Sequence, residues 1–176
     1  MRVLILPGLY GSGPEHWQSH WERQHTAFKR VEQADWVTPN CEDWTATLDA
    51  AICEENEPVI LVGHSLGSVT IAHWFQRYRR TIAGALIVAP SDTEAATFPS
   101  GTSGFAPIPL CRLPFPSILI ASTIDPYVSF ERTRQFATAW GSKLVALGDQ
   151  GHISTADGFG PWAEGLEYLA ELQEQS

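Results

Sequence analysis

Five short stretches of the chain are nearly continuous runs of apolar residues, rich in valine, isoleucine and leucine. They cover residues 2–6, 59–62, 83–88, 117–121 and 143–147. Runs of this length without polar alternation are typical of strands buried on both faces of a parallel sheet. A sixth strand is predicted over residues 31–36, where the pattern is more polar. The chain is therefore expected to form a sheet of six strands.

Between these runs, apolar residues recur three and four positions apart, which is the spacing of an amphipathic helix. The predicted helices cover residues 15–28, a segment that opens at Asp43 or Thr45 and closes before Pro58, a segment that follows residue 65 and ends near Arg80, residues 130–140, and residues 161–173. Strands that alternate with helices predict parallel pairing. The expected fold is an α/β three-layer sandwich, with a mostly parallel six-stranded sheet and helices on both faces.

The chain has 176 residues, a length that suits one domain, and we expect residues 1–176 to form it. A content of 44% hydrophobic and 18% charged residues is ordinary for a globular protein. The formal net charge of −9 argues against nucleic acid and anionic membranes as partners, because a basic surface is needed to displace their counterions. The first apolar run is too short for a signal peptide or a membrane span.

The three cysteines, Cys41, Cys53 and Cys111, show neither paired spacing nor a metal-ligand pattern. We expect them to be reduced thiols, which predicts a cytoplasmic location. The glycines at positions 8, 11 and 13 match neither of the phosphate-binding patterns G-x-G-x-x-G and G-x-x-x-x-G-K-[ST]. The sequence therefore predicts no metal, no nucleotide and no other cofactor.

The most informative stretch follows the run at residues 59–62. Gly63-His64-Ser65-Leu66-Gly67 fits the pattern G-x-S-x-G, and a helical pattern resumes directly after it. A strand, a sharp turn and a helix in this order are the context of a nucleophile elbow. The turn strains the backbone of its serine, and a Cβ atom at either flanking glycine would collide with the neighbouring strand or the following helix. Ser65 is therefore predicted to be a catalytic nucleophile at a helix N-terminus.

Two later strands are followed by residues that could complete a catalytic triad. Asp125 follows the fourth apolar run, and His152 follows the fifth. In an open parallel sheet the loops after the strands meet at one edge, and elbow-type hydrolases use the chain order Ser, Asp, His. His152, with an ordinary pKa of about 6.5, would take the serine proton, and Asp125 would orient its ring. Asp92 and Asp149 also follow strands and are the alternative acids.

Backbone N–H groups would bind the oxyanion of a tetrahedral intermediate. One would come from Leu66, the residue after the nucleophile. The other would come from the glycine-rich loop after the first strand, at Leu9 or alternatively at Tyr10. The glycine-rich loop after the first strand is therefore expected to supply one hydrogen-bond donor to the predicted site.

Aromatic residues near the expected mouth of the site are candidates for substrate contacts. They are Tyr10, Trp17 and Tyr127, which favour apolar acyl or aromatic groups. His64 is a further candidate, although its side chain is expected to point away from that of the nucleophile. Residues 91–116 have neither a helical nor a strand period. Long loops in compact domains are usually functional, so this loop is expected to shape the pocket.

These motifs resemble the α/β-hydrolase superfamily, and within it the small serine hydrolases of the retinoblastoma-binding-protein type. The matches are PGLYGSGPEHWQ at residues 7–18, the elbow, DPY at residues 125–127, GHI at residues 151–153 and GFGPWAEG at residues 158–165. The resemblance implies a compact hydrolase core without a large cap. It also implies the triad named above and hydrolysis of small esters or amides.

One part of that resemblance does not carry over. The retinoblastoma-binding pattern is L-x-C-x-E, whereas residues 51–55 read AICEE on a predicted helix, so this binding is not expected. The sequence favours a carboxylesterase-like serine hydrolase that forms an acyl-enzyme with a small ester, thioester or amide. The alternative is a non-catalytic protein-interaction module on a hydrolase scaffold.

Overall fold

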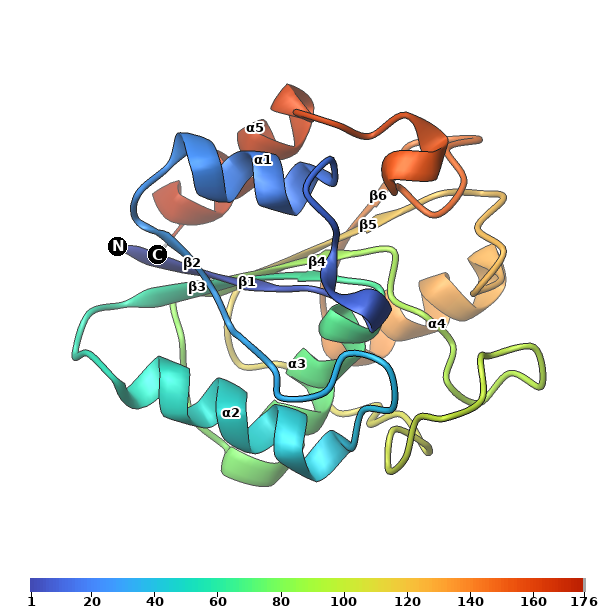
Figure 1. The fold of residues 1–176 in the computed structure, drawn as a ribbon, viewed down its shortest axis with the longest axis horizontal. Helices are drawn as coiled ribbons and strands as arrows, with labels where there is room; N and C mark the ends of the chain where they lie inside the picture. Colours follow the sequence, from blue (N-terminus) through green and yellow to red (C-terminus); the bar gives the residue numbers. More distant parts are fainter. Residues whose placement is uncertain (176) are drawn as a thin grey trace.

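The computed structural model describes residues 1–175, and its centre is a six-stranded parallel sheet (Figure 1). The strands are β1 (Arg2–Leu6), β2 (Phe28–Arg30), β3 (Val59–His64), β4 (Gly84–Val88), β5 (Ser117–Ala121) and β6 (Lys143–Ala146). Their order across the sheet is β2-β1-β3-β4-β5-β6. The chain changes its direction of winding between β1 and β3, which opens a crevice at the carboxyl ends of these strands.

Helices cover both faces of the sheet (Figure 1). One face carries α1 (Trp17–Gln24) and α5 (Ala163–Glu174), and the other carries α2 (Cys41–Cys53), α3 (Leu66–Tyr78) and α4 (Phe130–Trp140). Two short 3-10 helices, η1 (Leu9–Gly11) and η2 (Thr155–Asp157), lie in the loops after β1 and β6. The predicted three-layer α/β fold is confirmed.

The two core layers follow from the alternation of side chains along the strands. In β1, Val3 and Ile5 face the layer that contains α1 and α5. Leu4 and Leu6 face the opposite layer. Every residue of β1, β3, β4 and β5 is buried, which explains why these strands read as continuous apolar runs in the sequence.

The prediction fails at one edge of the sheet. The strand predicted over residues 31–36 is wrong, because the edge strand β2 lies earlier, at Phe28–Arg30, and pairs only with β1. The side chain of Asp35 instead accepts hydrogen bonds from the N–H groups of Val37 and Thr38. These bonds fold the predicted strand into a turn.

The starts of three helices also differ from the prediction. Helix α5 begins at Ala163 and not at residue 161, and the other two starts are set by caps. Helix α1 is shorter than residues 15–28, because His16 caps its first turn and its last residue, Gln24, comes before the edge strand. Helix α2 begins before Asp43, because the Asn40 side chain accepts hydrogen bonds from the N–H groups of its first turn. In both cases the capping side chain decides where the helix begins.

Residues 91–116 form a long loop without a helix or an extended strand, as predicted. Its first part is held against α4, where Arg132 forms ion pairs with Asp92 and Glu94. The loop therefore has a defined position beside the carboxyl ends of β4 and β5. Within residues 1–175, no helix has both the length and the apolar character needed to cross a membrane.

Candidate active site

Ser65 occupies a strained turn between β3 and α3, with φ 57° and ψ −123°. A Cβ atom at Gly67 would lie 2.1 Å from the carbonyl oxygen of Leu6, and one at Gly63 would lie 2.7 Å from the Cα atom of Ser68. Both distances are far below a permitted contact, so only glycine fits on either side of the serine. The close packing of the turn against β1 and α3 thus holds Ser65 in its strained conformation.

The loop after β1 lies directly against this serine. A Cβ atom at Gly8 would lie 2.7 Å from the Cβ atom of Ser65, so glycine is required for the close approach. The N–H group of Tyr10 donates to the carbonyl oxygen of Trp36 (2.9 Å) and is thereby engaged. Leu9 lines the same cavity as Ser65 and is the better candidate donor from this loop.

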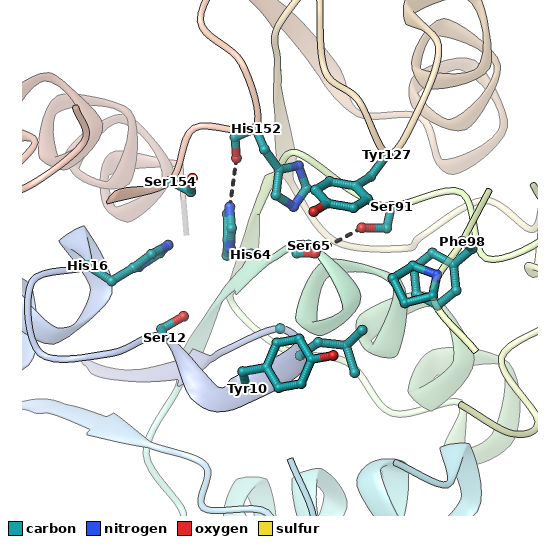
Figure 2. Close-up of a pocket in the computed structure, with 13 residues that line it drawn as sticks. Tyr10, Ser12, His16, His64, Ser65, Ser91, Phe98, Tyr127, His152 and Ser154 are labelled. Carbon is teal, nitrogen blue, oxygen red and sulfur yellow. Dashed lines mark hydrogen bonds between the residues drawn. The ribbon is translucent and has the colours of Figure 1, made fainter. Parts of the chain in front are cut away.

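His152 and Asp125 meet from the loops after β6 and β5. The Nδ1 atom of His152 lies 2.9 and 2.8 Å from the two carboxylate oxygens of Asp125. The Asp125 side chain is 1% exposed, and its Oδ1 atom also accepts a hydrogen bond from the N–H group of Tyr127 (2.8 Å). Carboxylate oxygens accept hydrogen bonds, so Nδ1 of His152 donates to Asp125, and Nε2 is the ring nitrogen left to face another group. The free edge of the ring is turned toward Ser65 (Figure 2).

The two alternative acids are bonded elsewhere. The Asp92 carboxylate lies 3.5 Å from Nε of Arg132, and Asp149 accepts a hydrogen bond from the hydroxyl of Thr123. In the described part of the chain, Asp125 is the carboxylate that contacts the His152 ring. Residues 1–175 also contain no group of three histidine, cysteine or acidic side chains arranged to hold a metal ion.

His64 supports the loop that carries His152. Burial, followed by the nearby rings of His16 and His152, holds the pKa of His64 well below its usual value. The ring is therefore neutral, and its Nε2 atom donates to the carbonyl oxygen of His152 (2.9 Å; Figure 2). Asp157 adds a second anchor, because its Oδ2 atom accepts a hydrogen bond from the N–H group of His152 (3.0 Å). The backbone of His152 is thus held from two directions.

Ser65 and His152 line one cavity of about 180 Å³. The other residues that line it are Gly8, Leu9, Tyr10, Ser12, His16, His64, Ser91, Phe98, Pro99, Tyr127 and Ser154. Three of them come from residues 91–116, so this loop shapes the cavity as expected. Ser91 is a site residue that the sequence analysis does not identify, although its position just after a buried strand is a signal that could have found it. Its Oγ atom lies 2.8 Å from Oγ of Ser65 (Figure 2).

The aromatic candidates for substrate contacts separate into two groups. Tyr10 and Tyr127 line the cavity at its rim and are 69% and 40% exposed. The Tyr127 ring also packs edge-to-face on His152, at 4.5 Å between ring centroids. Trp17 is fully buried instead, and its indole N–H donates to the carbonyl oxygen of Ile153 (3.0 Å). The structure corrects this expectation: Trp17 supports the wall from behind and does not face the cavity.

His16 lines the cavity on the side opposite Phe98 (Figure 2). Its Nδ1 atom accepts a hydrogen bond from the N–H group of Gln18 (3.2 Å), which caps α1. Burial, then the charge of Arg30 and the proximity of His152, lower the pKa of His16 to about 3. His16 and His64 therefore both stay neutral next to His152.

Comparison with known proteins shows the family and the fold of the chain. The model of the serine hydrolase family matches residues 3–171. A YdeN-like hydrolase from Pectobacterium atrosepticum is 37% identical, with a TM-score of 0.88 over 98% of this chain and 90% of that chain. The ydeN gene product of B. subtilis is 19% identical, with a TM-score of 0.76 over 98% of both chains, and shares the fold. Among curated proteins no relative matches. The chain belongs to the serine hydrolase family and has the α/β-hydrolase fold.

Proposed function

We propose that this serine hydrolase is an esterase that acts through an acyl-enzyme. Ser65 is the nucleophile, His152 the general base, and Asp125 the carboxylate that orients the base. The observation that carries the proposal is that a strained elbow serine and a carboxylate-bound imidazole line the same small cavity. A strained serine alone, or a histidine–aspartate pair alone, is common as a structural feature; both around one cavity favour acyl transfer.

The proposed reaction uses the groups already described. His152 removes the proton of Ser65 through Nε2 as Oγ attacks the carbonyl carbon of the ester. The N–H groups of Leu9 and Leu66 bind the resulting oxyanion; that of Leu66 lies in the first turn of α3, where N–H groups lack intrahelical acceptors. Such donors each contribute about 3–4 kcal/mol. His152 then returns the proton to the leaving alcohol, and water repeats the cycle to release the acid.

The size of the cavity limits the substrate. Its volume of about 180 Å³ is below the roughly 300–1,000 Å³ of pockets that enclose drug-sized ligands. Phe98 and Pro99 give one wall an apolar character. We therefore assign short-chain, uncharged acyl esters as the substrate class.

A fluorophosphonate probe and an ester series test the proposal together. Native protein should be labelled on Ser65, and the Ser65→Ala variant should not be labelled. With p-nitrophenyl acetate, butyrate and decanoate, kcat/KM should fall by at least about tenfold for the longest chain. Equal labelling of Ser65→Ala, or no labelling of folded native protein, would contradict the proposal. The second result would favour the non-catalytic interaction module instead.

Two expectations about the setting of the reaction stay predictions. The cytoplasmic location rests on the reduced state expected for the three cysteines, and thiol titration of protein isolated under alkylating conditions would check it. The expectation that small acyl esters, and neither nucleic acid nor membranes, are the partners rests on the net charge of −9 and on the family. An unchanged electrophoretic mobility of a DNA fragment mixed with the protein would support the exclusion of nucleic acid.

A further inference from the structure

Ser91 is a buried hydroxyl whose partner is the nucleophile. It follows the end of β4 and is 1% exposed. Its Oγ atom lies 2.8 Å from Oγ of Ser65, and within residues 1–175 this is the hydrogen bond that its side chain makes. Buried hydroxyl groups in proteins nearly always have a partner, and that partner is most often a backbone group. Ser91 differs from this pattern, because its partner is the side chain of Ser65.

The direction of this bond follows from counting donors and acceptors. A serine hydroxyl has one proton to donate and lone pairs to accept with. If Ser65 donated to Ser91, the Ser91 hydroxyl, which is 1% exposed, would have no acceptor among residues 1–175 for its own proton. If Ser91 donates to Ser65, the Ser65 proton is free for the lone pair of His152 Nε2. The second arrangement leaves the Ser65 proton available to His152, whereas the first commits it to Ser91.

We propose that Ser91 is a positioning residue that donates its hydroxyl proton to Oγ of Ser65 and so directs the Ser65 proton toward His152. The proposal rests on the triad assigned above. During attack one proton moves, from Ser65 to His152, and one bond forms, between Oγ and the carbonyl carbon. Ser91 keeps its proton throughout. While the proton passes to His152, Oγ carries partial negative charge, and the hydrogen bond from Ser91 is then stronger than in the resting site. The full negative charge forms on the carbonyl oxygen, where the oxyanion donors bind it.

The backbone around Ser91 is built to hold this position. Ala89 has a φ of 44°, a left-handed conformation that a residue with a Cβ atom adopts at a cost. Its N–H group donates to Ile120 on β5 (2.9 Å), and the N–H group of Ser65 donates to Val88 on β4 (3.0 Å). On the far side, the N–H group of Asp92 donates to Tyr127 (3.0 Å). Ser91 is thus fixed relative to the nucleophile and to the loop of the acid.

The same fold contains a matched control. Ser117 and Ser142 form a second pair of serine hydroxyls, with 2.7 Å between their Oγ atoms. Ser117 is the first residue of β5 and is 7% exposed, and Ser142 is half-buried, so the bond is part-buried like that of Ser91 with Ser65. It lies at the amino end of the sheet, away from the cavity. Loss of the Ser117 hydroxyl should therefore cost a similar hydrogen bond without changing the reactivity of Ser65.

The test compares wild type, Ser91→Ala, Ser91→Thr and Ser117→Ala. We would measure the second-order rate constant of fluorophosphonate labelling, kcat and KM for p-nitrophenyl acetate, and the melting temperature. Ser91→Ala should lower the labelling rate and kcat about tenfold, the value of one hydrogen bond, with KM unchanged. Ser91→Thr keeps the hydroxyl and should recover most of the rate. Ser117→Ala should react like wild type.

Three results would overturn the role of Ser91. The first is a Ser91→Ala variant that is labelled at the wild-type rate or faster. The second is an equal loss of rate in Ser117→Ala, which would indicate a general effect of stability. The third is a Ser91→Thr variant that melts with the wild type but reacts as slowly as Ser91→Ala. These results are distinct from failure of the proposed function, in which Ser65→Ala is labelled or native protein is not.

Discussion

The two ends of the sheet differ in how much backbone strain they contain. In residues 1–175, the non-glycine residues with positive φ in loops that follow strands are Tyr10, Ser12, Ser65, Ala89 and Ile153. One more, Arg79, is the C-cap of α3 at the amino end, where a left-handed residue is common. Strained backbone thus gathers around the cavity. Strain of this kind persists only where the surrounding structure overdetermines it, and it concentrates at functional sites.

The amino end of the sheet holds bonds that have no part in the cavity. Arg2 donates to carbonyl oxygens near the end of α2, and the hydroxyl groups of Ser117 and Ser142 form a hydrogen bond with each other. The contrast indicates a division: the carboxyl end is shaped for reactivity, and the amino end contributes stability. Substitutions at the carboxyl end should therefore change kcat or disturb the close packing that holds the strained turns. Substitutions at the amino end should change the free energy of unfolding alone.

The largest expected effect is that of Asp125→Asn. An asparagine side chain can hold the His152 ring in the wrong tautomer, so kcat for p-nitrophenyl acetate should fall by roughly 10⁴-fold. Asp149→Asn is the matched control, because Asp149 bonds Thr123 and not the His152 ring. It should keep kcat within about twofold of wild type. If Asp149→Asn or Asp92→Asn loses activity while Asp125→Asn does not, the acid is assigned to the wrong loop.

The same contrast explains which parts of the fold the sequence could predict. Strands β1, β3, β4 and β5 are buried on both faces, so each is a continuous apolar run and each was predicted. The edge strand β2 has three residues, of which Lys29 is exposed, and its position depends on pairing with β1. Pairing between distant segments leaves no local pattern. A polar three-residue strand is therefore invisible to periodicity.

The candidate site shows a similar limit. Ser65, Asp125 and His152 were placed because each follows a buried strand within a motif. Ser91 also follows a buried strand, but a single serine in a long loop is ordinary, and its value comes from a contact with Ser65. Trp17 was misplaced for the opposite reason. Its helical spacing predicts a buried face, yet periodicity cannot tell whether that face lies behind the cavity wall or along it.

The next largest effect is expected in stability, for the elbow glycine Gly67. Gly67→Ala would place a Cβ atom 2.1 Å from the carbonyl oxygen of Leu6 and 2.6 Å from that of Pro7, and these are backbone atoms that cannot turn aside as a flexible side chain can. We expect a loss of at least about 3 kcal/mol in the free energy of unfolding, measured by urea denaturation. Gly13→Ala is the control, since a Cβ atom there meets nothing within 4 Å. Equal losses in both variants would contradict the packing described for the elbow.

A change of intermediate size in the free energy of unfolding is expected when the pH is lowered. The pKa of His16 is lowered to about 3 in the folded protein and is about 6.5 when unfolded. The unfolded chain therefore binds a proton that the folded one does not, and stability is lost as the pH falls below 6.5. At pH 5 this loss is about 2 kcal/mol relative to pH 7.5.

The variant His16→Asn isolates this contribution. Asparagine keeps an acceptor that can cap α1, but it does not titrate. The loss of unfolding free energy between pH 7.5 and pH 5 should therefore be about 2 kcal/mol smaller than in wild type. His64 remains in both proteins, and its contribution largely cancels because burial, and only secondarily the His16 ring, lowers its pKa. The same pH dependence in both proteins would show that His16 is accessible to protons in the folded state.

The smallest effect is expected at the amino end, for Arg2→Met. The Arg2 guanidinium donates to the carbonyl oxygens of Ala51, Ile52 and Glu55 at the end of α2. A cation is favourable there because of the helix dipole, and methionine keeps the apolar stem while it removes the donors. We expect a loss of about 1–2 kcal/mol in the free energy of unfolding. Because β1 leads from Arg2 to the loop against Ser65, an unchanged kcat in this variant would show that the two ends act independently. A kcat that falls with stability would instead show that β1 transmits the loss to the nucleophile.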